Sequence, residues 1–136
     1  MSFNKTPAEA RALWCEALES GKYSQTQKHL CNKNGYCCLG VACEIFIEHE
    51  TGLEKQIDPK DDLGTVEYST CRFLLPENVR QWLGIDSQNG TFSNPISVEV
   101  KGYSPAHALV GLNDGGLNFH QISTFIRSNP PGLFVE

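Results

Sequence analysis

The sequence is poor in basic residues and has no cluster of them. Its 136 residues include 11 Lys and Arg against 16 Asp and Glu, which gives a formal net charge of −5. Between residues 34 and 69, two cations stand against eight acids. Domains that bind nucleic acid usually carry a basic stripe or patch that meets the phosphates. We therefore expect neither DNA nor RNA as a partner.

The sequence also lacks a long hydrophobic segment and a recognisable leader. Its longest apolar run, Cys37 to Ile47, is interrupted by Glu44 and spans eleven residues. A helix that crosses a bilayer needs roughly 20 apolar residues. Residues 1–7 show no basic segment followed by an apolar one, as signal and transit peptides would. We expect no membrane span, and a protein that stays in the cytoplasm in which it is made.

A metal-binding cysteine pattern is missing as well. The chain has six cysteines, which are Cys15, Cys31, Cys37, Cys38, Cys43 and Cys71, but no Cys-x2-Cys pair. In a helix, Cys38 and Cys43 would point about 140° apart, so they could not chelate from one face. Without export the thiols should be reduced, and they are better read as small buried hydrophobes. We expect no metal and no cofactor.

The elements that are present predict a compact single α+β domain over residues 1–136. It should be mainly helical, with about four to five helices and a small antiparallel sheet. The first helix is the best marked, because Thr6 and Glu9 form a capping box around Pro7, and Gly21 follows its end. Its apolar stripe comprises Ala10, Leu13, Trp14, Ala17 and Leu18.

Further helices are predicted over residues 38–50, 76–83, where Gly84 follows the end, and 104–112. A last helix is predicted from Asn118, which makes a capping-box-like start with Gln121. The alternation of Ile96, Val98 and Val100 with polar residues predicts the clearest strand, and residues 70–75 are a second candidate. Residues 53–69 are acidic and contain Pro59 and Gly64, which is typical of a solvated surface loop.

Several short blocks together resemble a family of small proteins encoded by bacteriophages and prophages. The resemblance covers most of the chain and rests on these blocks: Gly21-Lys22-Tyr23 with Gln25 and Leu30, Gly35-Tyr36-Cys37-Cys38-Leu39-Gly40-Val41-Ala42-Cys43-Glu44, Leu75-Pro76, Trp82-Leu83-Gly84, Asn94-Pro95, and Leu112-Asn113-Asp114-Gly115 with Phe119 and Ile122. The Cys-Cys-Leu-Gly-Val block is the most specific part. The resemblance implies a phage-type accessory protein in a bacterial cytoplasm and no assigned catalytic role.

Two polar segments are candidates for a ligand site. The first is the polar segment from Tyr23 to His29, which lies between two well-patterned helices. Its amides could read base edges, its cations could neutralise phosphate, and Tyr23 or Tyr36 could stack on a base. The second is the Asn113-Asp114-Gly115-Gly116 segment, whose glycines and following helix start could present backbone N–H groups to phosphate. The predicted ligand-binding residues are Tyr23, Gln25, Lys28, His29, Tyr36, Asn113 and Asp114.

From these segments and the phage resemblance we expect a counter-defence protein. It would sequester a nucleotide-derived host immune signal, either a cyclic dinucleotide or an ADP-ribose derivative. An apolar two-faced helix and an intersubunit site would be natural in such a protein, so a homo-oligomer fits this expectation.

Two other functions stay open. One is a protein-protein inhibitor of a host factor, with the acidic segment 53–69 imitating nucleic acid. The other is a cysteine-dependent hydrolase. Its nucleophile would be Cys37 or Cys38 at a helix N-terminus, with a histidine base and Asp114 to orient it. The candidate bases are His29, His107 and His120.

Overall fold

The first helix forms as its capping signals predict. The structure is a computed structural model and describes residues 3–135. Helix α1 (Pro7–Glu19) begins after Thr6, whose hydroxyl accepts the N–H of Glu9, while the Glu9 carboxylate accepts the N–H of Thr6. Trp14 is fully buried and donates its indole N–H to the carbonyl of Cys38 at 2.9 Å. The apolar stripe thus fixes α1 against the next helix.

Helix α2 (Cys38–His49) lies in the core and contacts α1, α3 and α4. All residues from Cys38 to Cys43 are buried, which confirms the prediction that this cysteine-rich block is internal. The block contains a glycine, Gly40, because the segment at Leu30 crosses the helix directly against its backbone. A Cβ at this position would lie 1.8 Å from the Leu30 carbonyl oxygen.

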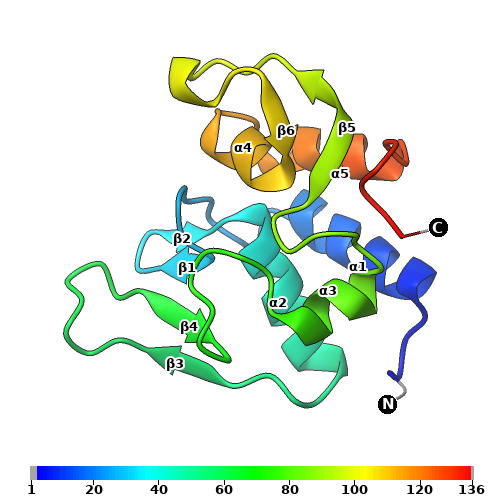
Figure 1. Cartoon of the computed structure of the whole chain (residues 1–136). Coiled ribbons are helices and arrows are strands. Elements are labelled where there is room, and N and C mark those ends of the chain that lie inside the picture. Colours follow the sequence, from blue (N-terminus) through cyan, green and yellow to red (C-terminus); the bar gives the residue numbers. More distant parts are fainter. Residues whose placement is uncertain (1–2, 136) are drawn as a thin grey trace.

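The remaining helices are short and are joined by three small sheets (Figure 1). The helices are α3 (Glu77–Leu83), α4 (Leu109–Asp114), α5 (Phe119–Arg127) and the 3-10 turn η1 (Lys101–Tyr103). The strands are β1 (Cys31–Asn32), β2 (Gly35–Tyr36), β3 (Lys55–Ile57), β4 (Val66–Tyr68), β5 (Thr91–Ile96) and β6 (Ala106–Ala108). They pair antiparallel as β1-β2, β3-β4 and β5-β6. The compact α+β single domain is confirmed, with three two-stranded sheets.

The structure corrects the predictions for residues 96–112. The strand expected over Ile96–Val100 was wrong apart from its first residue, because β5 ends at Ile96. The helix expected from Ser104 begins at Leu109, since residues 106–108 form β6 and pair with β5. This pairing joins segments that no local pattern links.

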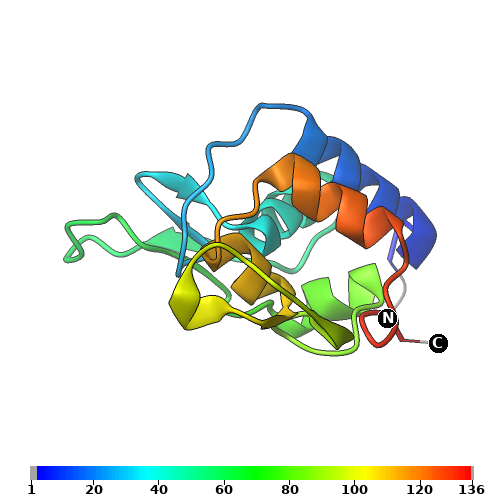
Figure 2. The ribbon, with the colours of Figure 1, turned by 90° about the horizontal axis from the view of Figure 1, so that it is seen from above.

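The acidic segment 53–69 contains the β3-β4 hairpin rather than an irregular loop. Val66 and Tyr68 of β4 are buried, whereas all of β3 is exposed. The short strand expected over residues 70–75 is absent, because Ser69 and Thr70 turn the chain with positive φ angles of 49° and 73°. The hairpin extends away from the helices in two perpendicular views (Figures 1 and 2).

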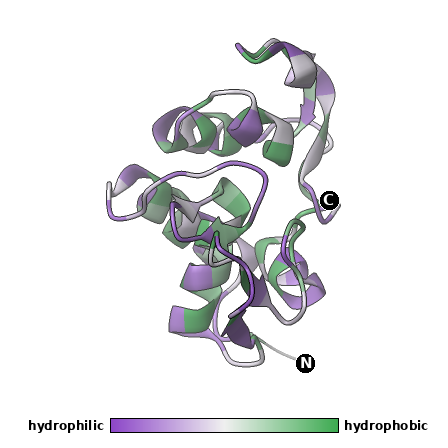
Figure 3. Ribbon diagram, turned by 90° about the vertical axis from the view of Figure 1, so that its left-hand side faces the viewer, coloured by the Kyte–Doolittle hydropathy of each residue, from purple (hydrophilic) through white to green (hydrophobic). Residues whose placement is uncertain are grey.

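Helices α1 and α5, which come from opposite ends of the sequence, pack against each other. Helix α5 begins with the capping box that Asn118 and Gln121 predict, and it lies alongside α1 (Figure 2). Within single helices the hydropathy alternates between hydrophobic and hydrophilic residues, as expected for amphipathic helices around one core (Figure 3). None of the helices in residues 3–135 is long and apolar enough to cross a membrane.

Candidate functional site

The two predicted polar segments do meet, and the buried amide of Asn113 joins them. Its Oδ1 accepts the side-chain N–H of Gln25 at 2.9 Å and the backbone N–H of Cys38 at 3.1 Å. Its Nδ2 donates to the carbonyl of Thr26 at 2.8 Å. Gln25 also donates to the carbonyl of Leu117 at 2.8 Å. Asn113 and Gln25 therefore hold the segments together, and the amide of Asn113 and the side-chain N–H groups of Gln25 are already engaged.

A cavity of about 170 Å³ lies beside this network. Its lining residues come from four parts of the chain: Lys28, His29, Cys37, Phe73, Leu74, Val110 and Asp114. Three of the seven predicted ligand-binding residues, Lys28, His29 and Asp114, thus share one cavity. Both predicted segments contribute to it.

The backbone at Lys28 is strained, and Asp114 holds it in place. Lys28 adopts φ = 69°, a left-handed conformation that costs a non-glycine residue roughly 1–2 kcal/mol. The carboxylate Oδ1 of Asp114 accepts the Lys28 N–H at 2.9 Å and also accepts from Asn113 at 3.3 Å. Among residues 3–135, nothing hydrogen-bonds to the other carboxylate oxygen. Strain of this kind is concentrated at functional sites.

One side of the cavity is aromatic and unusually exposed. The rings of His29 and Phe73 lie 5.3 Å apart at an angle of 44°. Phe73 is 54% exposed and the adjacent Leu74 is 42% exposed, so two large apolar side chains border the opening. Exposed apolar patches beside polar groups often mark binding surfaces.

Cys37 contributes a neutral thiol to this cavity. It occupies the N-cap position of α2, and nearby backbone N–H groups of Leu39 and Gly40 favour the thiolate. Burial outweighs them and raises the pKa of Cys37 to about 12. Within the described chain, His29 makes no hydrogen bond to this thiol. The arrangement therefore lacks the base contact that activates a cysteine nucleophile.

The other proposed nucleophile and bases fit the hydrolase less well. Cys38 is buried below the network, where burial raises the pKa of its thiol, and its Sγ faces the carbonyl of Leu109. His107 is on β6 and His120 is on α5, and neither lines the cavity. Of the proposed nucleophiles, bases and orienting acid, Cys37, His29 and Asp114 line this cavity together.

Tyr23 and Tyr36, which were also predicted to bind the ligand, do not line this cavity. Their rings form a T-shaped pair with centroids 5.3 Å apart. They lie near Glu44, whose Oε2 is 2.8 Å from Nζ of Lys55 and accepts the hydroxyl of Tyr68 at 2.6 Å. Burial raises the pKa of both Tyr23 and Tyr36. The two tyrosines belong to a separate surface.

Three lining residues, Phe73, Leu74 and Val110, are not predicted from the sequence. Phe73 and Leu74 lie in the segment 70–75, where the predicted strand would bury one of two neighbouring side chains. Both are exposed because the turn at Ser69 and Thr70 prevents a strand. Two adjacent apolar residues after a turn were the available signal.

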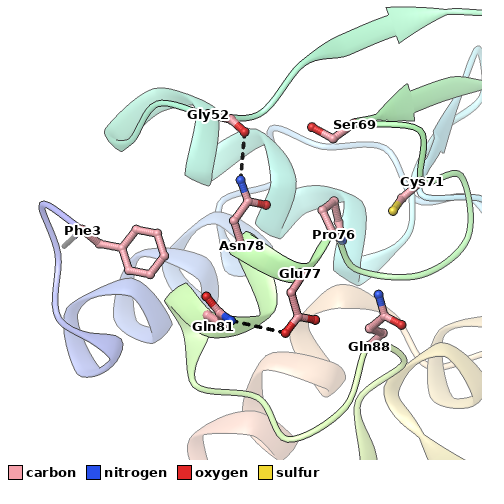
Figure 4. Close-up of a pocket in the computed structure, with 9 residues that line it drawn as sticks. All are labelled: Phe3, Gly52, Ser69, Cys71, Pro76, Glu77, Asn78, Gln81 and Gln88. Carbon is pink, nitrogen blue, oxygen red and sulfur yellow. Dashed lines mark hydrogen bonds between the residues drawn. The ribbon is translucent and has the colours of Figure 1, made fainter. Parts of the chain in front are cut away.

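A larger cavity of about 620 Å³ lies on another face, between α3 and the Gly52 and Ser69 turns (Figure 4). No Lys, Arg or His lines it, and none of the predicted ligand residues does. Its amides are partly engaged, since Asn78 donates to the Gly52 carbonyl at 2.9 Å and Gln81 to Glu77 at 3.3 Å. Its one charged side chain is acidic, so it does not suit a phosphate.

No group of three or more His, Cys, Asp or Glu side chains in residues 3–135 is arranged to hold a metal ion. The chain matches the family described as Domain of unknown function (DUF8296) over residues 7–130, and it belongs to that family. Neither the curated proteins nor the solved structures contain a match.

Proposed function

We propose that this member of the DUF8296 family is a phage-encoded counter-defence protein that binds and sequesters a nucleotide-derived immune signal in the cytoplasm of an infected bacterium. The signal would be a cyclic dinucleotide or an ADP-ribose derivative. The observation that carries the proposal is the cavity in which Lys28, His29 and Asp114 meet beside the exposed ring of Phe73.

Each of these groups suits one part of a nucleotide. The ammonium of Lys28 offers a positive charge for a phosphate, and His29 offers a ring N–H donor. The ring of Phe73, tilted against His29, gives a base an apolar face to stack on. The carboxylate oxygen of Asp114 that is not hydrogen-bonded within the described chain can accept a ribose hydroxyl. A bare inorganic anion would meet Asp114 unfavourably, which favours a ligand that also carries hydroxyl groups.

The cavity is too small for a whole dinucleotide. Its volume of about 170 Å³ is below the roughly 300 Å³ at which ligand pockets usually begin. One nucleotide portion would enter it, and the rest would lie over the exposed Phe73 and Leu74. A second copy of the chain could cover that part, because the two halves of a cyclic dinucleotide could occupy one cavity each. This arrangement accounts for the homo-oligomer we expect.

Sequestration fits the cavity better than turnover. The thiol of Cys37 is neutral far above physiological pH because its pKa is about 12. A nucleophilic cysteine needs a substantial thiolate fraction or an adjacent base. A ligand that binds beside a neutral thiol would be held without being cleaved.

Titration calorimetry against cyclic dinucleotides, ADP-ribose and cyclic ADP-ribose derivatives tests the proposal. We expect saturable binding of one of these compounds, recovery of the compound unchanged after denaturation, and roughly tenfold or greater loss of affinity in Lys28→Gln and Phe73→Ala. Lys22→Gln is the matched control, since it removes an exposed cation that does not line the cavity. Absence of binding to every compound would refute the proposal, and a changed product would indicate an enzyme.

The exposed pair Phe73 and Leu74 also favours a second function, inhibition of a host protein through this surface. The acidic hairpin is a weaker candidate for that contact than its composition indicates. Arg72 lies 3.0 Å from Asp58 and 2.5 Å from Glu67, so two of its acids are already paired. Capture of one host protein by the wild type, lost in the double variant Phe73→Ala and Leu74→Ala, would support this function. A sequestering protein needs no such partner.

A further inference from the structure

Arg11 is the exception among the four arginines of the chain. Arg72 pairs with Asp58 and Glu67, Arg80 pairs with Glu77, and Arg127 pairs with Glu19. Within residues 3–135, Arg11 has no carboxylate partner. This is unexpected in a protein with 16 acids and a net charge of −5, because a partly buried charge is normally paired.

The guanidinium of Arg11 is nevertheless held firmly. Its Nε donates to the carbonyl of Leu83 at 2.6 Å, and Nη2 donates to that of Gly84 at 3.3 Å. It also lies 3.8 Å from the centre of the Phe134 ring. These carbonyls end α3, and a helix C-terminus carries only about half a negative charge. The positive charge is therefore partly offset, and Nη1 has no hydrogen-bond partner within the described residues.

A cavity of about 390 Å³ lies next to this guanidinium, between α1 and α5, two helices that run side by side (Figure 2). Its apolar lining includes the small side chains of Ala8 and Ala12 on α1 and the side chain of Ile126 on α5. Both alanines are exposed, so the notch exists because larger side chains are absent from one face of α1. The volume is within the range of small-molecule pockets, roughly 300–1,000 Å³.

The charges at this cavity favour Arg11 as the contact for a ligand. Arg127 also lines it, but Nε of Arg127 lies 2.7 Å from Oε2 of Glu19, and Nη2 donates to the other carboxylate oxygen at 3.3 Å. That pair neutralises Arg127. Among residues 3–135, Arg11 is left with a fixed position, N–H groups that make no hydrogen bond and no carboxylate partner.

We propose that this cavity binds a small organic carboxylate with an apolar body. The carboxylate meets the unused N–H groups of Arg11, and the apolar body lies in the notch between Ala8 and Ala12. Planar guanidinium groups recognise carboxylates through paired hydrogen bonds. This site is separate from the proposed nucleotide cavity and does not depend on it.

NMR titration of the full chain with phenylacetate tests this inference, with neutral phenylacetamide as the matched probe. We expect saturable binding of phenylacetate and roughly tenfold or more weaker binding of the amide, the loss that one charge-assisted hydrogen bond produces. The peptide Ala-Ala-Phe with a free or an amidated C-terminus shows whether the carboxylate can come from a chain end. Binding of phenylacetate alone assigns the site to free acids.

Two variants locate the binding. Arg11→Gln removes the charge, and Ala12→Leu fills the notch while it leaves the contacts of Arg11 in place. Both should weaken phenylacetate binding roughly tenfold or more, whereas Lys22→Gln should not change it. Because Arg11→Gln could loosen the end of α3, Ala12→Leu keeps the test valid if that variant does not fold. Absence of saturable binding, or binding that Ala12→Leu leaves unchanged, overturns the inference.

Discussion

Asn113 and Asp114 are neighbours in α4, yet they serve two different regions. Asn113 is 0% exposed, and its amide joins Gln25, Thr26 and the start of α2 in an internal network. Asp114 is half-buried and lines the adjoining cavity with one carboxylate oxygen that is not hydrogen-bonded within the described chain. Two adjacent polar residues that both look like ligand contacts in the sequence thus have different roles. One holds the fold together, and the other is available to a ligand. The difference is whether the fold has already satisfied their hydrogen bonds.

The largest expected effect on stability comes from a change in the internal hydrogen-bond network around Asn113, here called the network side, as opposed to the cavity side around Asp114. Asn113→Ala should lower the free energy of unfolding by roughly 3–5 kcal/mol, because it leaves the Cys38 N–H and the Thr26 carbonyl without partners inside the core. Urea denaturation measures this loss. Asp114→Ala is the matched comparison on the cavity side, and we expect it to cost less than half as much. Equal losses would show that the two regions are not distinct.

A second network-side change concerns the contact between the polar segment and α2. Gly40→Ala should destabilise the protein by about 3 kcal/mol or more, because the added Cβ would overlap the Leu30 carbonyl, which accepts the Cys37 N–H at 3.0 Å. Gly102→Ala is the control, since a Cβ there has no neighbour within 4 Å. Thermal unfolding of the two variants compares them. A Gly40→Ala protein as stable as the control would contradict the close packing.

Cys37 lies on the boundary between the two regions, and pH shows how buried its thiol is. Its folded pKa of about 12 is above the ordinary value of 9.0, so the thiol contributes stability below pH 9 that is lost between pH 9 and 12. We expect this thiol alone to reduce the free energy of unfolding by about 1.4 kcal/mol per pH unit in that range. Cys37→Ala should make the dependence shallower by that amount. An unchanged slope would show that the thiol is open to solvent.

The smallest effect on stability is expected on the cavity side. Lys28→Gly relieves the left-handed strain at φ = 69° but adds chain entropy to the unfolded state, so stability should change by less than about 1 kcal/mol. Nucleotide binding should nevertheless fall as in Lys28→Gln. Lys28→Ala keeps the strain and removes the charge, so it separates the two causes. If Lys28→Gly lost several kcal/mol, Lys28 would belong to the scaffold.

The elements that were predicted correctly have local signals. Thr6 with Glu9 and Asn118 with Gln121 form their capping boxes within four residues, and Gly84 ends α3 in the left-handed conformation. Strand pairing was the main failure, because Ile96 meets Ala106 across a turn and no local pattern specifies that register. Of the predicted ligand-binding residues, Lys28, His29 and Asp114 line one cavity, and their role in binding stays a prediction. Residue chemistry selects polar groups but not the hydrogen bonds that the fold gives them.

Local chemistry in the amino-acid sequence was enough to establish the α+β class, the buried character of the Cys37–Cys43 block and the polar segments worth testing. The tertiary structure decided which of those polar groups remain available to a ligand. It joined half-buried Gln25 to buried Asn113 by a hydrogen bond, placed Tyr23 and Tyr36 away from the cavity, and brought Lys28, His29 and Asp114 together with Phe73. The physical reason is distance along the chain. Lys28 and Asp114 are 86 positions apart, and only packing around α2 brings them together.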